Sequence, residues 1–250
     1  MDVQRGTRVI GILVPSSSDL DLSATIRQAI AFHGRGADIV DLDMLPGGPF
    51  AGIDEDAVAL LVRGLGEAGI PASVTTTDAS VARIALAHGV RWIIDPSGTT
   101  ADPEMFSVAR RPSLAGWIIG PWSPRLVAER GIDAYNEGLV RNLAALLEAG
   151  VHSDRIVLNA SAGLSATASD PWRMLNHLDR IKALGYPILI DARDELLASM
   201  SSDDSAARLE DAAVGLAVLA AGVGAWGIRT RGAERVAGAV QRILEPRRSA

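Results

Sequence analysis

Carboxylates and arginines end several of the apolar segments in this sequence. They are Asp41, Asp43, Asp95, Asp191, Arg193, Arg229 and Arg231. Arginine suits phosphate-like oxyanions because its planar fork donates parallel hydrogen bonds. Carboxylates can act as general bases or supply the oxygen ligands that Mg²⁺ prefers. The residue types therefore allow an anion site, a metal site or a proton-transfer site. Alternatively, the two charge types neutralise each other in internal ion pairs.

Uncharged polar side chains end the other segments. Thr75 stands in the stretch SVTTTDASVARIALAHGVRWIIDPSG, which ends near Ser97, and Asn159 and Ser161 end a later segment. Hydroxyl and amide groups can orient a ligand by hydrogen bonds. Thr75 occupies a position where catalytic barrels often carry a carboxylate, so this stretch indicates either unusual chemistry or chemistry that has been lost.

The elements that must position these side chains alternate between strand and helix along the whole chain. Near-continuous apolar runs, typical of strands buried on both faces of a parallel sheet, span 8–14, 37–43, 71–77, 91–95, 115–120, 155–161, 186–192 and 225–231. Patterns with helical period span 24–35, 55–68, 80–88, 134–148, 172–184, 206–222 and 233–244, with a less regular one at 103–111. Glycines that suit helix ends precede the next strand at 36, 69, 89, 150, 185 and 224.

Eight such units in 250 residues predict an α/β fold, a single-domain (β/α)₈ TIM barrel. In that fold the carboxyl ends of the strands carry the active site, which places the polar residues above on one face. The alternative is a doubly wound open sheet. Its dinucleotide motif is matched in letters by GVGAWG at 222–227, but here a helix precedes the glycines and a strand follows, the reverse of the required order.

Composition excludes several classes of protein. The formal net charge of −6 argues against nucleic acid or an anionic membrane as a partner. There are no cysteines, so disulfides and thiolate chemistry are excluded. No apolar run reaches the roughly 20 residues of a membrane span, and the start MDVQRGTRVIGILVP lacks the pattern of a signal peptide. We expect a cytoplasmic protein. The four histidines fall on predicted helices or a distal loop, which disfavours imidazole catalysis.

Six segments, in order, resemble the dihydropteroate synthase family, the pterin-binding barrel of folate biosynthesis. They are IGILVPSSSD (10–19), GADIVDLD (36–43), ASVTTTDASVARIALAHGVRWIIDPSG (72–98), IVLNASAGLSAT (156–167), GYPILIDARDEL (185–196) and GAWGIRTR (224–231). The resemblance implies one pterin-binding-like domain over 1–250. It also implies a transferase reaction that joins 4-aminobenzoate to a dihydropterin methyl pyrophosphate, with Mg²⁺ holding the leaving diphosphate. Mg²⁺ is therefore expected as a cofactor only if that activity is retained.

The resemblance also implies which residues of the family site are replaced. Where the family has an asparagine that meets the metal and the diphosphate, this sequence has either Val14 or a one-residue gap. Thr75 and Asn159 stand at the positions of two aspartates that contact the pterin. Ile94 replaces an asparagine, although Asp95 beside it is kept.

The anion-binding segments are altered in a similar way. A glycine-rich loop with Glu-Ser-Thr-Arg-Pro is shortened to MLPGGP, and it has lost its arginine. Arg193 is kept, but Asp194 replaces the lysine of the family's Ser-Arg-Lys motif. Arg229 is also kept, while Arg231 replaces a histidine. The shortened loop resembles that of a divergent second family member found in actinobacteria.

Our first hypothesis is a dihydropteroate-synthase-like protein without synthase activity that still binds a small anionic or pterin-like ligand. The ligand-binding residues expected at the mouth are Asp41, Thr75, Asp95, Asn159, Asp191, Arg193, Arg229 and Arg231. One alternative is a divergent enzyme that uses carboxylates of the same pocket for proton transfer or metal binding. Another is a synthase that is still active. The apolar helix at 206–225 is expected to cover strands and could also bury a face in a homodimer.

Overall fold

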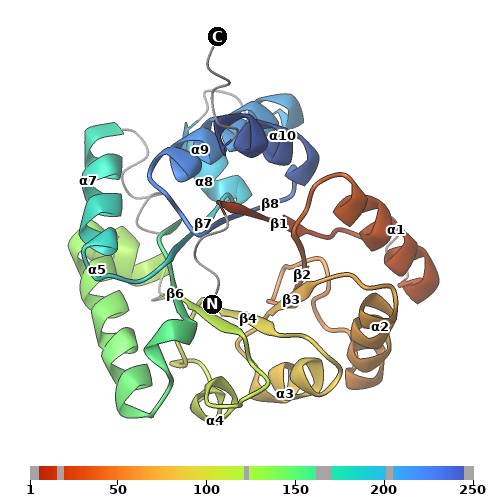
Figure 1. The fold of residues 1–250 in the computed structure, drawn as a ribbon. Coiled ribbons are helices and arrows are strands. Elements are labelled where there is room, and N and C mark those ends of the chain that lie inside the picture. Colours follow the sequence, from red (N-terminus) through yellow and green to blue (C-terminus); the bar gives the residue numbers. More distant parts are fainter. Residues whose placement is uncertain (1–5, 16–19, 121–123, 162–170, 201–204, 245–250) are drawn as a thin grey trace.

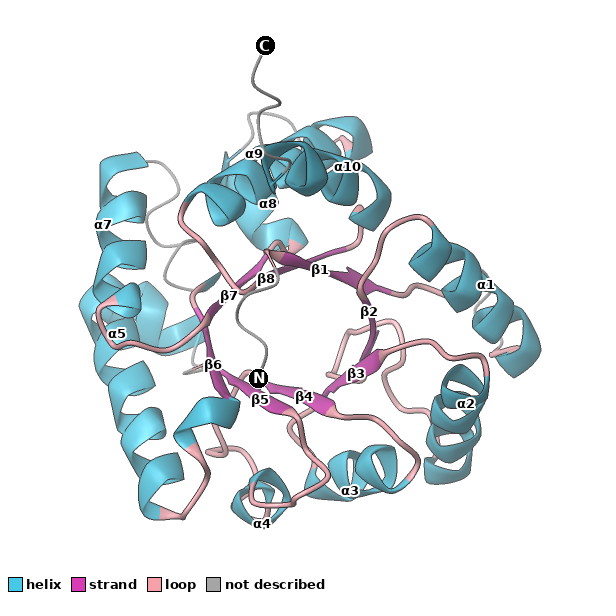
Figure 2. Ribbon diagram, viewed as in Figure 1, coloured by secondary structure: helices cyan, strands magenta, loops and turns pink. Residues whose placement is uncertain are grey.

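The computed structural model describes residues 6–15, 20–120, 124–161, 171–200 and 205–244. Eight parallel strands close into a barrel in chain order, with helices on the outside (Figures 1 and 2). The strands are β1 (Arg8–Ile12), β2 (Ile39–Asp43), β3 (Ala72–Thr75), β4 (Trp92–Asp95), β5 (Gly116–Ile119), β6 (Ile156–Asn159), β7 (Ile188–Asp191) and β8 (Gly227–Thr230). The predicted single-domain TIM barrel is confirmed.

The helices also follow the predicted order. They are α1 (Leu22–Gly34), α2 (Glu55–Glu67), α3 (Ala79–Ala87), α4 (Met105–Ala109), α5 (Pro124–Glu148), α7 (Pro171–Lys182), α8 (Asp194–Met200), α9 (Ala206–Gly222) and α10 (Ala233–Leu244), with a 3₁₀ turn at Ser153–Arg155. Two differences concern the site. The sequence analysis missed α8, because its seven residues are too few to show a helical period. Helix α5 begins ten residues earlier than predicted, at a proline that suits a first helical position.

Local sequence signals fix where the helices begin and end. Asp21, Asp54 and Asp78 precede α1, α2 and α3, and each carboxylate accepts hydrogen bonds from backbone N–H groups of the first turn. The glycines predicted to end helices have φ angles between 69° and 112°, at residues 36, 69, 89, 150, 185 and 224. Other residue types rarely adopt this left-handed backbone conformation, so glycine allows each chain reversal.

The strands bury both of their faces, as their apolar runs predicted. One face fills the barrel with a small cluster, made of Ile10, Ile39, Ile94, Ile118, Val157, Leu189 and Trp226. The other face packs beneath the helices in a much larger core. Polar side chains are concentrated at the carboxyl ends of the strands, and this is the end that forms the barrel mouth. Among the described residues, no helix is both long and apolar enough to cross a membrane.

Candidate functional site

Arg229 lies at the centre of the barrel mouth, fully buried at the end of β8. Three aspartates from β2 and β7 surround it, and we call Asp41, Asp43 and Asp191 the carboxylate cage. The Arg229 Nε donates to Asp41 at 3.0 Å, and Nη2 donates to Asp41 and Asp43, both at 2.7 Å. Nη1 donates to the two oxygens of Asp191, at 3.0 and 3.1 Å. Each of the three guanidinium nitrogens therefore donates to at least one aspartate.

The cage follows from strand register. Asp41 and Asp43 are two residues apart on β2, so their side chains point to the same face of the strand. Asp191 is the register partner of Arg229 on the neighbouring strand β7. Burial alone lowers the pKa of Arg229, but the three aspartates outweigh burial and raise it well above its ordinary value. The arginine therefore stays charged, and its charge is neutralised from inside the protein.

Asp41 connects this cage to Thr75. The Asp41 carboxylate accepts hydrogen bonds from Ser73 Oγ at 2.5 Å and from Thr75 Oγ1 at 2.9 Å, in addition to those from Arg229. Burial raises the pKa of Asp41, and the neighbouring Asp43 adds to this effect, while Arg229 opposes it. Thr75 is fully buried, and its hydroxyl is directed at Asp41. The sequence analysis did not single out Ser73, although its spacing of two from Thr75 places both on one face of β3.

Arg193 is the second arginine that the fold brings to the cage. Its Nε donates to Asp191 at 2.9 Å, and its Nη2 lies 3.8 Å from Asp43. Burial raises the pKa of Asp191, but Arg229 and Arg193 outweigh burial and lower it overall. Arg193 is partly exposed, with 28% of its side chain accessible. Two arginines and three aspartates thus share the centre of the mouth, so one carboxylate is in excess.

Arg231 lies apart from this group. Its Nη1 donates to Asp194 at 2.7 Å, and about half of each side chain is exposed. Of the three arginines expected at the mouth, Arg193 and Arg229 share Asp191, whereas Arg231 pairs with Asp194 at the surface. For Arg229 the geometry is that of the internal ion-pair alternative.

Asp95 organises the loop after β4. One of its oxygens accepts from the backbone and hydroxyl of Ser97, at 2.9 and 2.6 Å, and the other accepts from Thr99 N at 2.6 Å. Thr99 has a φ of 71°, an unusual backbone conformation for a residue with a side chain. Asn142 closes the loop from α5, because its amide donates to the carbonyl of Ser97 at 3.2 Å. Asp95 is fully buried, and both of its oxygens hold the chain turn.

Replacing Asp95 by asparagine tests this arrangement through its pH dependence. Burial raises the pKa of Asp95 to about 6, although the hydrogen bonds from Ser97 and Thr99 oppose the shift. Between about pH 4 and 6, Asp95 is therefore protonated in the folded state but ionised in the unfolded state. Because the folded state binds the extra proton, the contribution of Asp95 to the free energy of unfolding falls as the pH rises through this range.

The Asp95→Asn variant does not titrate at this position. We expect its loss of unfolding free energy, relative to the parent protein, to be about 1 kcal/mol larger at pH 5 than at pH 7.5. Urea denaturation at the two pH values measures this difference. The same loss at both values would contradict the assigned burial effect.

The Asn159 side chain also forms hydrogen bonds with the chain just after its own strand. Its Oδ1 accepts from Ser161 N at 3.0 Å and from Ser161 Oγ at 2.5 Å, and Ser161 Oγ in turn contacts the backbone N–H of Asp191. The buried hydroxyl of Tyr135, on α5, donates to the carbonyl of Asn159. The chain therefore uses Asn159 to link β6 to β7. Its sequence position alone indicated a ligand contact.

Parts of two of the family-like segments, residues 16–19 and 162–167, lie outside the described part of the chain. Among the described residues, no group of three or more histidines, cysteines, aspartates or glutamates is arranged to hold a metal ion. The carboxylates of the cage are directed at Arg229, and the side chain of Val14 at the end of the β1 segment carries no ligand atom. The described residues therefore do not fit Mg²⁺.

Comparisons with known proteins agree with this architecture. The family model described as pterin binding enzyme matches residues 15–231. This chain belongs to that family. The dihydropteroate synthase of Mycobacterium leprae is 32% identical to it, covering 89% of this chain and 87% of that protein. A second protein from the same organism, named inactive dihydropteroate synthase 2, is 28% identical over 69% of this chain and 64% of its own length.

Solved structures show the same fold. The dihydropteroate synthase of Thermus thermophilus, in complex with the ligand abbreviated 6HMPPP, superposes with a TM-score of 0.77 at 23% identity, covering 97% and 94% of the two chains. That of Xanthomonas albilineans, in complex with 7,8-dihydropteroate, gives 0.77 at 20% identity, covering 97% and 93%. The barrel and the family resemblance are therefore confirmed, and the roles of the individual mouth residues stay predictions.

Proposed function

We propose that this chain is a member of the dihydropteroate synthase family that does not carry out the synthase reaction. The observation that carries the proposal is the saturation of Arg229. All three of its guanidinium nitrogens donate to Asp41, Asp43 and Asp191, so binding a phosphate would require breaking buried ion pairs. The centre of the mouth holds three carboxyl groups and two guanidinium groups, so no cation is in excess there to attract an anion.

The pterin side of the mouth supports the same proposal. Thr75 and Asn159 replace two aspartates of the family pattern, and both of their side chains bond to groups of the protein itself. Each buried hydrogen-bond partner that a ligand loses costs about 1–3 kcal/mol. Two such losses together weaken binding by roughly 30-fold to 10⁴-fold.

A divergent enzyme is favoured less by this geometry. The raised pKa of Asp95 would suit a general base. However, Asp95 is fully buried, and both of its oxygens accept hydrogen bonds from its own loop, so neither is directed at a substrate. Anion binding through Arg229 is also disfavoured, because all three of its nitrogens already donate to aspartates.

The test is a direct assay of synthase activity and binding. The purified chain is titrated calorimetrically with dihydropterin methyl pyrophosphate and Mg²⁺, and separately with diphosphate alone. It is then assayed for turnover with 4-aminobenzoate. The Mycobacterium leprae dihydropteroate synthase, measured in parallel, shows that the reagents are active. We expect no turnover and no diphosphate binding at concentrations that saturate that enzyme. Turnover by this chain would overturn the proposal.

A further inference from the structure

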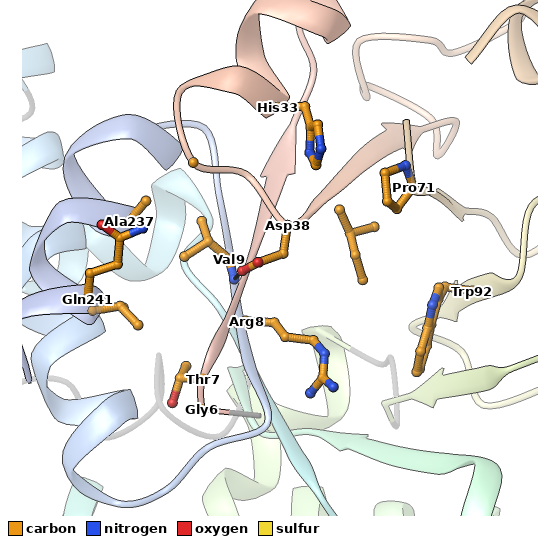
Figure 3. A pocket seen from close by; sticks show the side chains of 13 residues that line it. Gly6, Thr7, Arg8, Val9, His33, Asp38, Pro71, Trp92, Ala237 and Gln241 are labelled. Atoms are coloured by element: carbon orange, nitrogen blue, oxygen red, sulfur yellow. Dashed lines mark hydrogen bonds between the residues drawn. The ribbon is translucent and has the colours of Figure 1, made fainter. Parts of the chain in front are cut away.

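A cavity lies at the opposite end of the barrel from the mouth. It has a volume of about 470 Å³, within the size range of small-molecule sites. Figure 3 shows its walls, which come from the amino-terminal ends of β1, β2 and β4 and from helices α1 and α10. Its polar lining includes Arg8, His33, Asp38 and Gln241. None of these residues belongs to the carboxylate cage or to its loops.

Trp92 supplies one wall of this cavity, and its indole is held in place. On the neighbouring strand β5, a Cβ atom added to Gly116 would lie 1.9 Å from the Trp92 ring, so only glycine leaves room for the indole there. On another side the ring packs against Trp226, with centroids 4.8 Å apart. A fixed aromatic side chain is a preorganised surface for a planar ligand, because little conformational entropy is lost on stacking.

Two hydrogen-bond acceptors lie in the same lining. His33 bonds through Nδ1 to the carbonyl of Ala37 at 2.6 Å. A carbonyl only accepts, so Nδ1 carries the hydrogen, and Nε2 of the neutral ring is an acceptor. Asp38 accepts from Val9 N at 2.8 Å through Oδ2, and its Oδ1 has no partner among the residues that the structure describes.

The charges of the lining restrict the ligand further. Arg8 is positive and lies over the Trp226 ring, 5.1 Å from its centroid, while Asp38 is negative. These charges balance, which favours a neutral ligand over an anion or a cation. The Trp92 wall and the two acceptors, His33 Nε2 and Asp38 Oδ1, are complementary to a ligand with a planar ring and hydrogen-bond donors along one edge.

We propose that the cavity between Trp92, His33 and Asp38 binds a neutral, planar nitrogen heterocycle whose edge carries an amino group and a ring N–H. Guanine nucleosides and pterins share this aminopyrimidinone edge. The proposal is independent of whether the mouth has lost its synthase activity, because the two sites lie at opposite ends of the strands.

The first test compares guanosine, inosine and pterin by calorimetry. Inosine differs from guanosine only in lacking the amino group, so it removes one donor that would face an ionised acceptor. We expect guanosine or pterin to bind at least tenfold more tightly than inosine. Whichever of the two binds more tightly identifies the class of compound. No binding of guanosine or pterin at millimolar concentration, or equal binding of inosine, would overturn the proposal.

The second test locates the site with a matched pair of variants. Asp38→Asn keeps an oxygen for Val9 N but turns the other acceptor into a donor, so we expect a tenfold or larger loss of affinity. Asp54→Asn makes the same charge change at the start of α2, away from the cavity, and should leave affinity unchanged within twofold. Nuclear magnetic resonance of the indole N–H groups provides a second readout, in which the Trp92 signal should shift.

Two results would contradict this location. One is binding that Asp38→Asn leaves unchanged, since the ligand would then occupy another site, such as the mouth. The other is a ligand-induced shift in indole signals that spares Trp92. Circular dichroism of both variants shows whether each is folded, so a loss of affinity is not confused with a loss of structure.

Discussion

Replacing Arg229 by methionine is expected to lower the free energy of unfolding by at least 3–5 kcal/mol. The methionine fills similar space but leaves Asp41, Asp43 and Asp191 buried without the cation that neutralises them. An uncompensated buried charge is among the most destabilising changes in a protein interior. Urea denaturation at pH 7.5 measures the loss.

The matched control for this experiment is Arg231→Met, on the segment that leaves the same strand. Arg231 and Asp194 are about half exposed, so their ion pair contributes about 0–1 kcal/mol. If Arg229→Met does not fold at all, Arg229→Lys keeps the charge but loses the planar fork, and its loss should be smaller. A loss below about 1 kcal/mol in Arg229→Met would contradict the structural role given to the cage.

Replacing Asp41 by alanine is the second change with a large expected effect. The truncation removes the acceptor used by Ser73, Thr75 and two nitrogens of Arg229 in a fully buried place. Because unsatisfied buried donors cost about 1–3 kcal/mol each, and more for charged groups, we expect a total loss of about 3–5 kcal/mol. The measurement is again urea denaturation at neutral pH.

Asp41→Asn separates hydrogen bonding from charge. Its oxygen can still accept from Arg229 and Thr75, and its amide can donate to the Ser73 hydroxyl, which can turn to accept. The variant also removes the carboxylate in excess at the mouth. We expect it to lose about 1 kcal/mol or less. A loss as large as that of Asp41→Ala would show that charge, rather than hydrogen-bond satisfaction, determines the stability at Asp41.

Both predictions test the same feature, the buried ion pairs between Arg229 and the carboxylate cage. In a mouth that binds anions, buried arginine needs donor groups left over for the ligand. Here aspartates of β2 and β7 accept from all three nitrogens of Arg229, so its charge is neutralised without a ligand. The proposed loss of synthase activity is compatible with retention of the fold, because the barrel core and its lower face supply the stability.

The sequence by itself determined the fold. Eight continuous apolar runs indicated strands that are buried on both faces, as in a parallel sheet. Helical patterns that end in glycine separate these runs, and eight such strand–helix units favour a barrel over other α/β folds. The segments in family order determined the family, and strand ends located the polar residues on one face. Helix α8 could not be predicted, because a helix of seven residues that follows a strand directly has too few turns to show a helical period.

Only the tertiary structure decided what those polar residues do. Asp41 and Arg229 are 188 residues apart, and nothing in their local sequence says whether the guanidinium faces a ligand or a carboxylate. Closure of the barrel between β8 and β1 brings them together where both side chains are fully buried, and a buried charge needs a partner. The same holds for Thr75, Asp95 and Asn159, whose residue types suited a ligand. Their partners proved to be the protein itself, because a buried polar group bonds to whichever partner the fold places within reach.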